Sequence, residues 1–307
     1  MTGMDRPGDP QAPLPPAPAL EFCYRHPTEV TRVHCTRCNR PICPDCMIPA
    51  PVGHQCPECV GRARKEFAQG PGRKVAVRSI TATKVLLAAI LGVFVLEVLV
   101  SGGGALGTGP NGQRLFDLGA LYPPAIAIDG QYWRLFTAMF LHAGLFHIMF
   151  NAWALWVFGT MVERDFGTAR YLAIFFVTGF FASATSYAFG PVNQLAVGAS
   201  GAIFGIFGAF VAYNWRRRHL AMAAQNLRWA MTLILLNAVL AFTLGAIDWR
   251  AHLGGFVAGV AAGFAADQAR NRKQGTLIAV AGFVAIAAVG VALVMWRTAD
   301  IRSMVGL

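Results

Sequence analysis

The sequence predicts an all-α polytopic membrane protein with a small zinc-binding domain at its N-terminal end. Of its 307 residues, 55% are hydrophobic and only 13% are charged, whereas soluble domains carry about a quarter charged residues. From residue 85 onward, apolar runs approach the roughly 20 residues that cross a bilayer as a helix. All seven cysteines lie between Cys23 and Cys59, which separates this short region from the membrane part.

Seven apolar segments are expected to span the membrane as helices. They cover residues 85–100, 144–162, 169–189, 200–215, 228–247, 251–267 and 277–296. The fourth and sixth are short and rich in glycine, so hydropathy alone scores them weakly. Residues 101–141 separate the first two segments. They form too long a connection for a simple turn and are expected to have structure of their own.

The positive charges predict the orientation of these helices. Of the 26 lysines and arginines, 16 fall in the segments 62–84, 163–170, 216–228 and 268–276, and only five fall in the connections on the other side or in the tail. Because cytoplasmic loops collect Lys and Arg, the N-terminus is expected in the cytoplasm and the C-terminus outside the plasma (inner) membrane. The net charge of +11 is thereby explained by topology, and no nucleic-acid partner is expected.

The cysteine-rich region contains four pairs of metal-ligand candidates, each pair separated by two residues. The pairs are Cys23 and His26, Cys35 and Cys38, Cys43 and Cys46, and Cys56 and Cys59. A two-residue gap lets both side chains bind one tetrahedral Zn²⁺, so four pairs predict two structural zinc ions. About 40 residues bury too little apolar surface to fold without such support. A reduced, metal-free thiol cluster is the alternative.

The order of the pairs resembles a B-box-like zinc finger with crossed ligand pairs. The resemblance implies that the first and third pairs bind one ion and that the second and fourth bind the other. Sequential pairing is a second arrangement compatible with the spacing. His34 and His54 lie nearby but are not needed, because eight ligands are already available. The domain is expected to bind a cytoplasmic protein partner or to present a regulatory surface.

Four polar residues inside the predicted membrane helices require an explanation, since such groups are costly there. His147 and Asn151 lie four residues apart on one face of the second helix, Ser200 begins the fourth, and His252 follows the start of the sixth. These three helices run in the same direction, so all four side chains are expected at a similar depth near the outer side. This coincidence predicts one shared site.

Glycines on the fourth and sixth helices predict how that site is closed. Gly201, Gly205 and Gly208 follow Ser200, while Gly255, Gly259 and Gly263 repeat every four residues after His252. Strips of small residues let membrane helices approach closely, and contact between these two strips would bring Ser200 to His252. Each feature taken alone has a structural explanation, such as a serine that bonds its own backbone or a buried histidine donor.

Taken together, these residues resemble the rhomboid family of intramembrane serine proteases. The matching pieces are Trp133-Arg134, then His142, His147 and Asn151, then Gly198 with Ser200-Gly201, and finally Ala251-His252 with Gly255 and Gly259. The resemblance covers about residues 83–270 and implies a six-helix bundle with one additional C-terminal transmembrane helix. It does not extend to the zinc-binding domain.

The resemblance also implies roles for individual residues. Ser200 would be the nucleophile and His252 its general base and acid, without a required acidic third member. The backbone N–H of Ser200 with His147 and Asn151 would stabilise the oxyanion. His142 and Phe204 would support the site, and Arg134 would belong to the loop that lies partly in the outer leaflet. No catalytic cofactor is implied.

The predicted organisation has five parts. They are a disordered leader (1–20), the B-box-like zinc-binding domain (21–61), a basic linker (62–84), the rhomboid-like protease core (85–270) and the additional helix with its tail (271–307). The predicted function is cleavage of transmembrane protein substrates near their outer end, within the lipid bilayer. A catalytically silent, helix-binding rhomboid-like protein is the main alternative. A transporter or proton channel is a third, but the symmetric halves and paired carboxylates typical of transporters are not seen.

Overall fold

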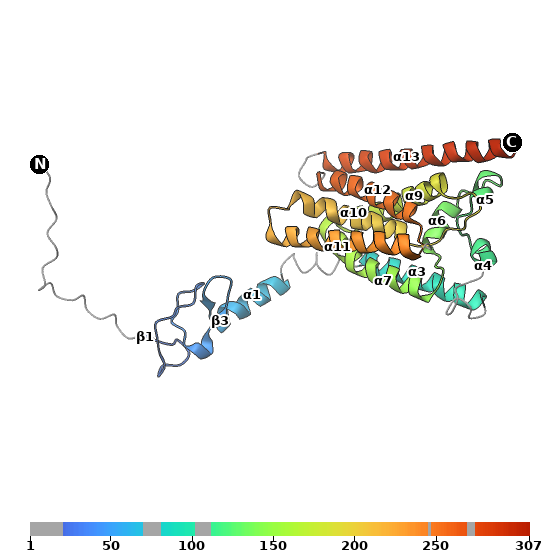
Figure 1. Ribbon diagram of the computed structural model, residues 1–307. Coiled ribbons are helices and arrows are strands. Elements are labelled where there is room, and N and C mark those ends of the chain that lie inside the picture. The colour runs from blue at the N-terminus through green and yellow to red at the C-terminus, as the bar shows by residue number, and fades with distance from the viewer. Residues whose placement is uncertain (1–20, 70–80, 102–111, 245–246, 269–273) are drawn as a thin grey trace, which may run out of the picture. The chain divides into compact units, whose positions relative to one another are not determined.

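A computed structural model of the chain describes residues 21–69, 81–101, 112–244, 247–268 and 274–307 (Figure 1). The predicted disordered leader and the middle of the basic linker lie outside the described residues, as do residues 102–111 of the long connection. The chain divides into two compact units, Met1–Val75 and Ala76–Leu307.

The first unit is built around its cysteines. Two small antiparallel hairpins pair β1 (Glu21–Phe22) with β2 (Val30–Thr31), and β3 (Ile48–Pro49) with β4 (His54–Gln55). A 3-10 turn, η1 (Pro44–Cys46), lies between them, and helix α1 (Pro57–Gln69) follows. Six cysteines and Ile42 are buried here. A core composed largely of thiols is typical of a domain held together by metal rather than by apolar packing.

The second unit consists of helices among its described residues. Its long helices are α3 (Thr81–Val100), α7 (Leu145–Ala154) continued by η4 (Leu155–Gly159) and α8 (Thr160–Phe166), α9 (Thr168–Phe189), α10 (Ser200–Arg216), α11 (Ala221–Leu244), α12 (Trp249–Gln268) and α13 (Gly275–Met304). Short helices α4 (Gly112–Asp117), α5 (Pro123–Ala127) and α6 (Arg134–Thr137), with η3 (Ala138–Phe140), lie between α3 and α7. The expectation that this connection has its own structure is therefore confirmed.

Each predicted membrane segment corresponds to one of the long helices, but two of the predicted boundaries were wrong. Helix α11 begins at Ala221 rather than at residue 228, because the intervening residues Ala-Met-Ala-Ala-Gln-Asn-Leu are mostly strong helix formers. Helix α13 continues to Met304 rather than ending at residue 296. The last residues of this helix, 297–304, are more polar but pack against the rest of the bundle, since Thr298 and Ile301 are buried.

Four segments are long and apolar enough to cross a membrane among the residues that the structure describes. They are Ala82–Val100, Leu145–Phe166, Thr168–Phe189 and Gly275–Met304. Helices α10 and α12 are not among them, as their short, glycine-rich sequences predict. These two helices owe their place in the bundle to close packing with neighbours rather than to their own hydropathy.

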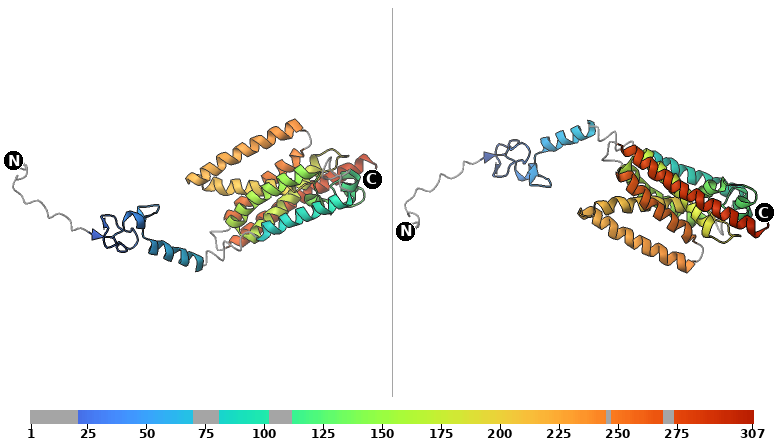
Figure 2. Two further views of the ribbon diagram at one scale, coloured as in Figure 1. Left: turned by 90° about the horizontal axis from the view of Figure 1, so that it is seen from below. Right: turned by 90° about the horizontal axis from the view of Figure 1, so that it is seen from above.

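Helix α9 packs against α10, α12 and α13, helix α12 packs against α10 and α13, and α10 makes its most extensive contact with α12. Figure 1 shows α12 between α10 and α13, and Figure 2 shows the same group from two further directions. At the end of α12 farthest from His252, Asp267 is buried and pairs with Arg216 and Arg217 of α10, with N–O distances of 2.8 Å in both cases. The two helices are thus fixed at that end by ion pairs.

Candidate active site and metal centres

Glycines set the contact between α10 and α12. A Cβ atom added at Gly255 would run into the carbonyl oxygen of Gly201, and one at Gly259 would run into that of Gly205. One turn further, a Cβ at Gly263 would come within 2.7 Å of the Ala209 Cα. The two strips of small residues therefore face each other in register, as the sequence predicts, and side chains larger than glycine would force the helices apart.

Ser200 is the first residue of α10 and follows Gly198 by two residues. Gly198 has a φ of +131°, a conformation that favours glycine. A Cβ at this position would lie 2.8 Å from Nε2 of His147 and 3.5 Å from Oγ of Ser200. The imidazole of His147 and the hydroxyl of Ser200 therefore flank the same small space.

Two polar residues of α7, His147 and Asn151, lie one helical turn apart. The backbone N–H of Ala143 donates to Nδ1 of His147 over 3.3 Å, which assigns the ring proton to Nε2, the nitrogen nearer Gly198. One turn later, Asn151 is buried, and its Nδ2 has no hydrogen-bond partner among the described residues. A buried amide donor without a partner is uncommon and is typical of a group reserved for a ligand or an intermediate.

His252 lies in the first turn of α12 and is buried, with 9% of its surface exposed. The ring of Phe204 stacks on its imidazole, with the centroids 4.3 Å apart and the planes inclined by 13°. Phe204 lies one turn after Ser200 on α10, so the stacking joins the helix that carries the serine to the helix that carries the histidine. This contact restricts the orientation of the imidazole ring.

His142 packs against His147. Its ring meets that of His147 edge to face, with the centroids 5.2 Å apart, and its Nδ1–H donates to the Phe140 carbonyl over 3.1 Å. The backbone N–H of His142 donates to Oε1 of Glu97, a fully buried residue of α3, over 2.9 Å. No sequence pattern indicates this partner of Glu97, because the contact crosses from α3 to the residues preceding α7.

Comparisons with known proteins point to one family. A family model described as the Rhomboid domain matches residues 129–269. The chain is 38% identical over 172 residues to the rhomboid protease GluP of Bacillus subtilis (strain 168), covering 55% of this chain and 31% of GluP. It is 35% identical over 170 residues to Rhomboid-like protease 1 of Toxoplasma gondii, covering 53% of this chain and 57% of that protein.

A shorter relative decides the family. YdcA of Bacillus subtilis (strain 168) is 32% identical over 145 residues, and the match covers 47% of this chain and 72% of YdcA. The chain belongs to the rhomboid family. It is a multi-pass integral membrane protein, and Ser200, His252, His147 and Asn151 all lie within the residues that match the Rhomboid domain.

Within the rhomboid domain, Arg134 organises the connection between α3 and α7. This buried guanidinium donates to the carbonyl oxygens of Phe116 and Ala120 over 2.7 and 2.9 Å and to Oε1 of Gln131 over 2.6 Å. It also lies over the Phe116 ring, 4.1 Å from its centroid. Arg134 therefore holds this connection together through its hydrogen bonds and its ring contact. None of these contacts involves Ser200.

Outside the rhomboid domain, the structure brings the eight metal-ligand candidates together in two groups. One contains Cys23, His26, Cys43 and Cys46, and the other contains Cys35, Cys38, Cys56 and Cys59. Within each group the ligand atoms all lie within 4.8 Å of one another. The first pair thus joins the third, and the second joins the fourth, which is the crossed arrangement rather than the sequential one. His34 and His54 belong to neither group.

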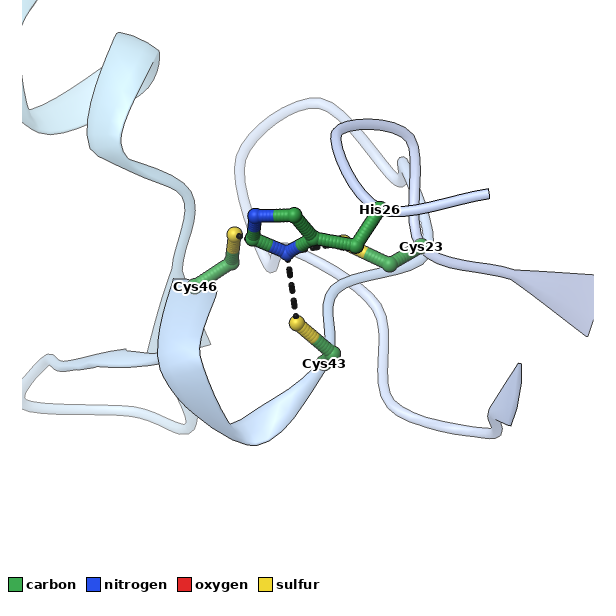
Figure 3. Close-up of side chains that lie close together, drawn as sticks. All are labelled: Cys23, His26, Cys43 and Cys46. Carbon is green, nitrogen blue, oxygen red and sulfur yellow. Dashed lines mark hydrogen bonds between the residues drawn. The ribbon is translucent and has the colours of Figure 1, made fainter. Parts of the chain in front are cut away.

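The distances between ligand atoms fit a tetrahedral zinc ion. Nδ1 of His26 lies 3.1, 3.6 and 3.9 Å from Sγ of Cys43, Cys46 and Cys23 (Figure 3). In the second group, Sγ of Cys38 and Cys56 are 3.8 Å apart. Bond lengths of about 2.3 Å for Zn–S and about 2.0 Å for Zn–N place tetrahedral ligand atoms about 3.6 to 3.8 Å apart. Both groups could therefore hold Zn²⁺.

The thiol pKa values point the same way. Burial raises the pKa of the Cys23 thiol, but hydrogen bonds led by the backbone N–H of Cys43 outweigh it and bring the pKa to about 6. The Cys35 thiol has a pKa of about 6 for the same reasons. Burial and neighbouring sulfurs raise the pKa of Cys46 to about 11 and that of Cys59 to about 12. Cys23 and Cys35 thus supply one thiolate to each group near pH 7, and a cation such as Zn²⁺ would be needed to ionise Cys46 and Cys59.

Proposed function

We propose that the protein is an intramembrane serine endopeptidase that cleaves transmembrane helices of other membrane proteins near their outer end. The observation that carries this proposal is the glycine-lined contact between α10 and α12, because it packs the helix that begins with Ser200 against the helix that carries His252. The stacking of Phe204 on His252 and the similarity to the rhomboid protease GluP and to Rhomboid-like protease 1 support it.

In this proposal Ser200 and His252 form a catalytic dyad. The imidazole of His252 accepts the proton of the Ser200 hydroxyl while the oxygen attacks the scissile carbonyl. The protonated His252 then donates that proton to the leaving amine, and an acyl-enzyme on Ser200 remains. A water molecule, deprotonated by His252, then attacks the acyl carbonyl. Oγ of Ser200 leaves and takes the proton back from His252, which frees the carboxylic acid product and restores both residues.

The donors around Ser200 are suited to stabilise the oxyanion. We assign this role to the Nε2–H of His147, the Nδ2–H of Asn151 and the backbone N–H of Ser200. Ser200 is the first residue of α10, and the N–H groups in the first turn of a helix have no acceptor within that helix. The buried Nδ2 of Asn151, which has no hydrogen-bond partner in the described part of the chain, supports the assignment, since a donor that is already desolvated costs no reorganisation during the reaction.

The substrate class follows from where the site lies. The backbone of a transmembrane helix is bonded internally within the bilayer core, so cleavage requires local unwinding near a helix end. Ser200 and His252 both lie at the starts of their helices, which the distribution of Lys and Arg assigns to the outer side of the plasma (inner) membrane. In this orientation the N-terminus is cytoplasmic, and water reaches the site from outside.

For the N-terminal unit we propose two structural Zn²⁺ ions, one in each crossed group of ligands, within a B-box-like domain at residues 21–61. Four protein ligands would close each site, so no position for catalysis on the metal is left open. The domain lies outside the matched rhomboid residues and is assigned to binding a cytoplasmic protein partner. No cofactor is assigned to the proteolytic reaction.

Cleavage by the purified protein tests the proposal. The full-length wild type and the Ser200→Ala variant are reconstituted into liposomes with a fluorescently labelled, single-pass membrane protein as the substrate. We expect a discrete cleavage product from the wild type and none from Ser200→Ala. Equal cleavage by both proteins would reject the dyad, and failure of the folded wild type to cleave any of a panel of helical substrates would favour a silent, helix-binding protein.

A further inference from the structure

Asp248, which the catalytic proposal does not use, joins the start of α12 to the end of α9. Its Oδ1 accepts hydrogen bonds from the backbone N–H groups of Arg250 and Ala251, each over 3.2 Å. Its Oδ2 accepts a hydrogen bond from the hydroxyl of Ser186. The first two bonds are those of a helix N-cap, which usually serves only its own helix. Here the same carboxylate also binds a neighbouring helix.

These contacts surround the turn that carries His252. The backbone N–H of His252 donates to the carbonyl of Asp248 over 3.2 Å, so the two residues belong to one helical turn. Two residues after His252, a Cβ at Gly254 would run into the side chain of Thr185. The last turn of α9 therefore contacts α12 on both sides of His252, through Ser186 before it and through Thr185 after it.

We propose that Asp248, held by Ser186, is a positioning residue that sets the rotation of the first turn of α12 and thereby the direction in which the His252 imidazole faces Ser200. The inference rests on the proposed function and deepens it. The contacts of Asp248 described above are with the hydroxyl of Ser186 and with the backbone of the turn that carries His252. They hold the backbone of that turn, whereas the stacking on Phe204 acts on the imidazole ring of His252.

A purely structural cap is the competing explanation, and the same helix offers a matched control. Asp267 is likewise a buried carboxylate that ties α12 to a neighbouring helix, through Arg216 and Arg217 at the opposite end. Losing either carboxylate should lower stability. Only the loss of Asp248 should change turnover beyond what the loss of stability explains, because only Asp248 adjoins His252.

The experiment compares full-length wild type, Asp248→Ala, Asp248→Asn, Ser186→Ala and Asp267→Asn in liposomes. Values of kcat and KM are measured with one transmembrane substrate, and thermal unfolding midpoints are measured in detergent. We expect Asp248→Ala to lower kcat about 10- to 100-fold with KM within about twofold, as a misplaced catalytic group does. Asp248→Asn, whose amide oxygen still caps the helix, should recover most of that loss.

The remaining variants decide between the explanations. If Asp248→Ala does not fold, Ser186→Ala takes its place, because it removes the hydrogen bond from Ser186 and leaves the helix cap by Asp248 intact. The kcat of Ser186→Ala should fall about threefold or more, and its unfolding midpoint should not change. Combining Ser186→Ala with Asp248→Ala should add little, since both break the same contact. A loss of kcat that matches Asp267→Asn at equal destabilisation would overturn the inference. In that case the proposed function would still stand if the wild type cleaves the substrate and Ser200→Ala does not.

Discussion

Phe204 stacks on the imidazole of His252 with a centroid distance of 4.3 Å and an angle of 13° between the rings. The two rings belong to α10 and α12, whose backbones are in contact through facing glycines. The stacking therefore depends on the helix contact, and both restrict where His252 lies relative to the first residue of α10.

Replacing Phe204 should affect turnover more than stability. We expect Phe204→Leu to lower kcat up to about tenfold, since an aromatic pair contributes about 0.5–1.5 kcal/mol beyond the area it buries and the leucine side chain cannot stack on the imidazole. Steady-state cleavage kinetics measure the change. Phe210→Leu is the control, because Phe210 is a buried phenylalanine of the same helix that packs on aromatic rings rather than on His252. Equal losses in both variants would argue against a role for the stacking.

Removing the unsatisfied amide of Asn151 should slow the chemical step. We expect Asn151→Ala to lower kcat about 100- to 1,000-fold with little change in KM, because an oxyanion donor acts mainly in the transition state. The same variant should leave the unfolding midpoint unchanged or raised, since the buried Nδ2 has no partner among the described residues. A fall in stability without a fall in kcat would assign Asn151 to packing instead.

Glycines at the helix contact should tolerate no side chain. Gly255→Ala should destabilise the protein by about 1–3 kcal/mol and abolish most activity, because its Cβ would meet the Gly201 carbonyl. Gly92→Ala on α3 provides the control, since a Cβ there meets nothing within 4 Å; it should be neutral or stabilising by up to about 1 kcal/mol. Unfolding in detergent measures both. Similar stability of the two variants would contradict the close contact of α10 with α12.

The N-terminal unit should contain two zinc ions, and they should be lost in acid. Metal analysis of the full-length protein should find about two Zn²⁺ per chain at pH 7. Cys46→Ser, which removes one ligand from the first group, should leave about one. Protons compete with the metal at Cys46 and Cys59 already near pH 7, because the pKa values of these thiols are about 11 and about 12. Below about pH 6 protons also compete at Cys23 and Cys35, whose pKa values are about 6, so zinc should be released as the pH falls from about 6 toward about 4. One ion per wild-type chain would contradict two crossed sites.

The sequence predicts the parts of this protein that depend on spacing along the chain. Glycines four residues apart after Ser200 and His252 predict the α10–α12 contact, because that spacing defines one face of a helix. Cysteine and histidine pairs two residues apart predict metal-ligand groups for a similar reason. In both cases the chemistry requires a local pattern that can be read before the fold is known.

The residues that the sequence could not assign depend on distant partners. Glu97 binds the backbone of His142, 45 residues later, and Asp248 binds Ser186, 62 residues earlier. Glu163 likewise accepts bonds from the backbone and hydroxyl of Thr83, 80 residues earlier. A buried carboxylate shows in the sequence only that a partner is required. Backbone N–H and hydroxyl partners leave no pattern, although Asp248 just before a helix carries the signature of an N-cap.

Labelling with a fluorophosphonate probe tests most directly whether His252 activates Ser200. The membrane-reconstituted wild type, Ser200→Ala and His252→Ala are treated with the probe, and the modified peptide is mapped by mass spectrometry. We predict stoichiometric modification of Ser200 in the wild type and none at this position in either variant. Equal labelling of Ser200 in the wild type and in His252→Ala, or modification of another residue in place of Ser200, would contradict the dyad.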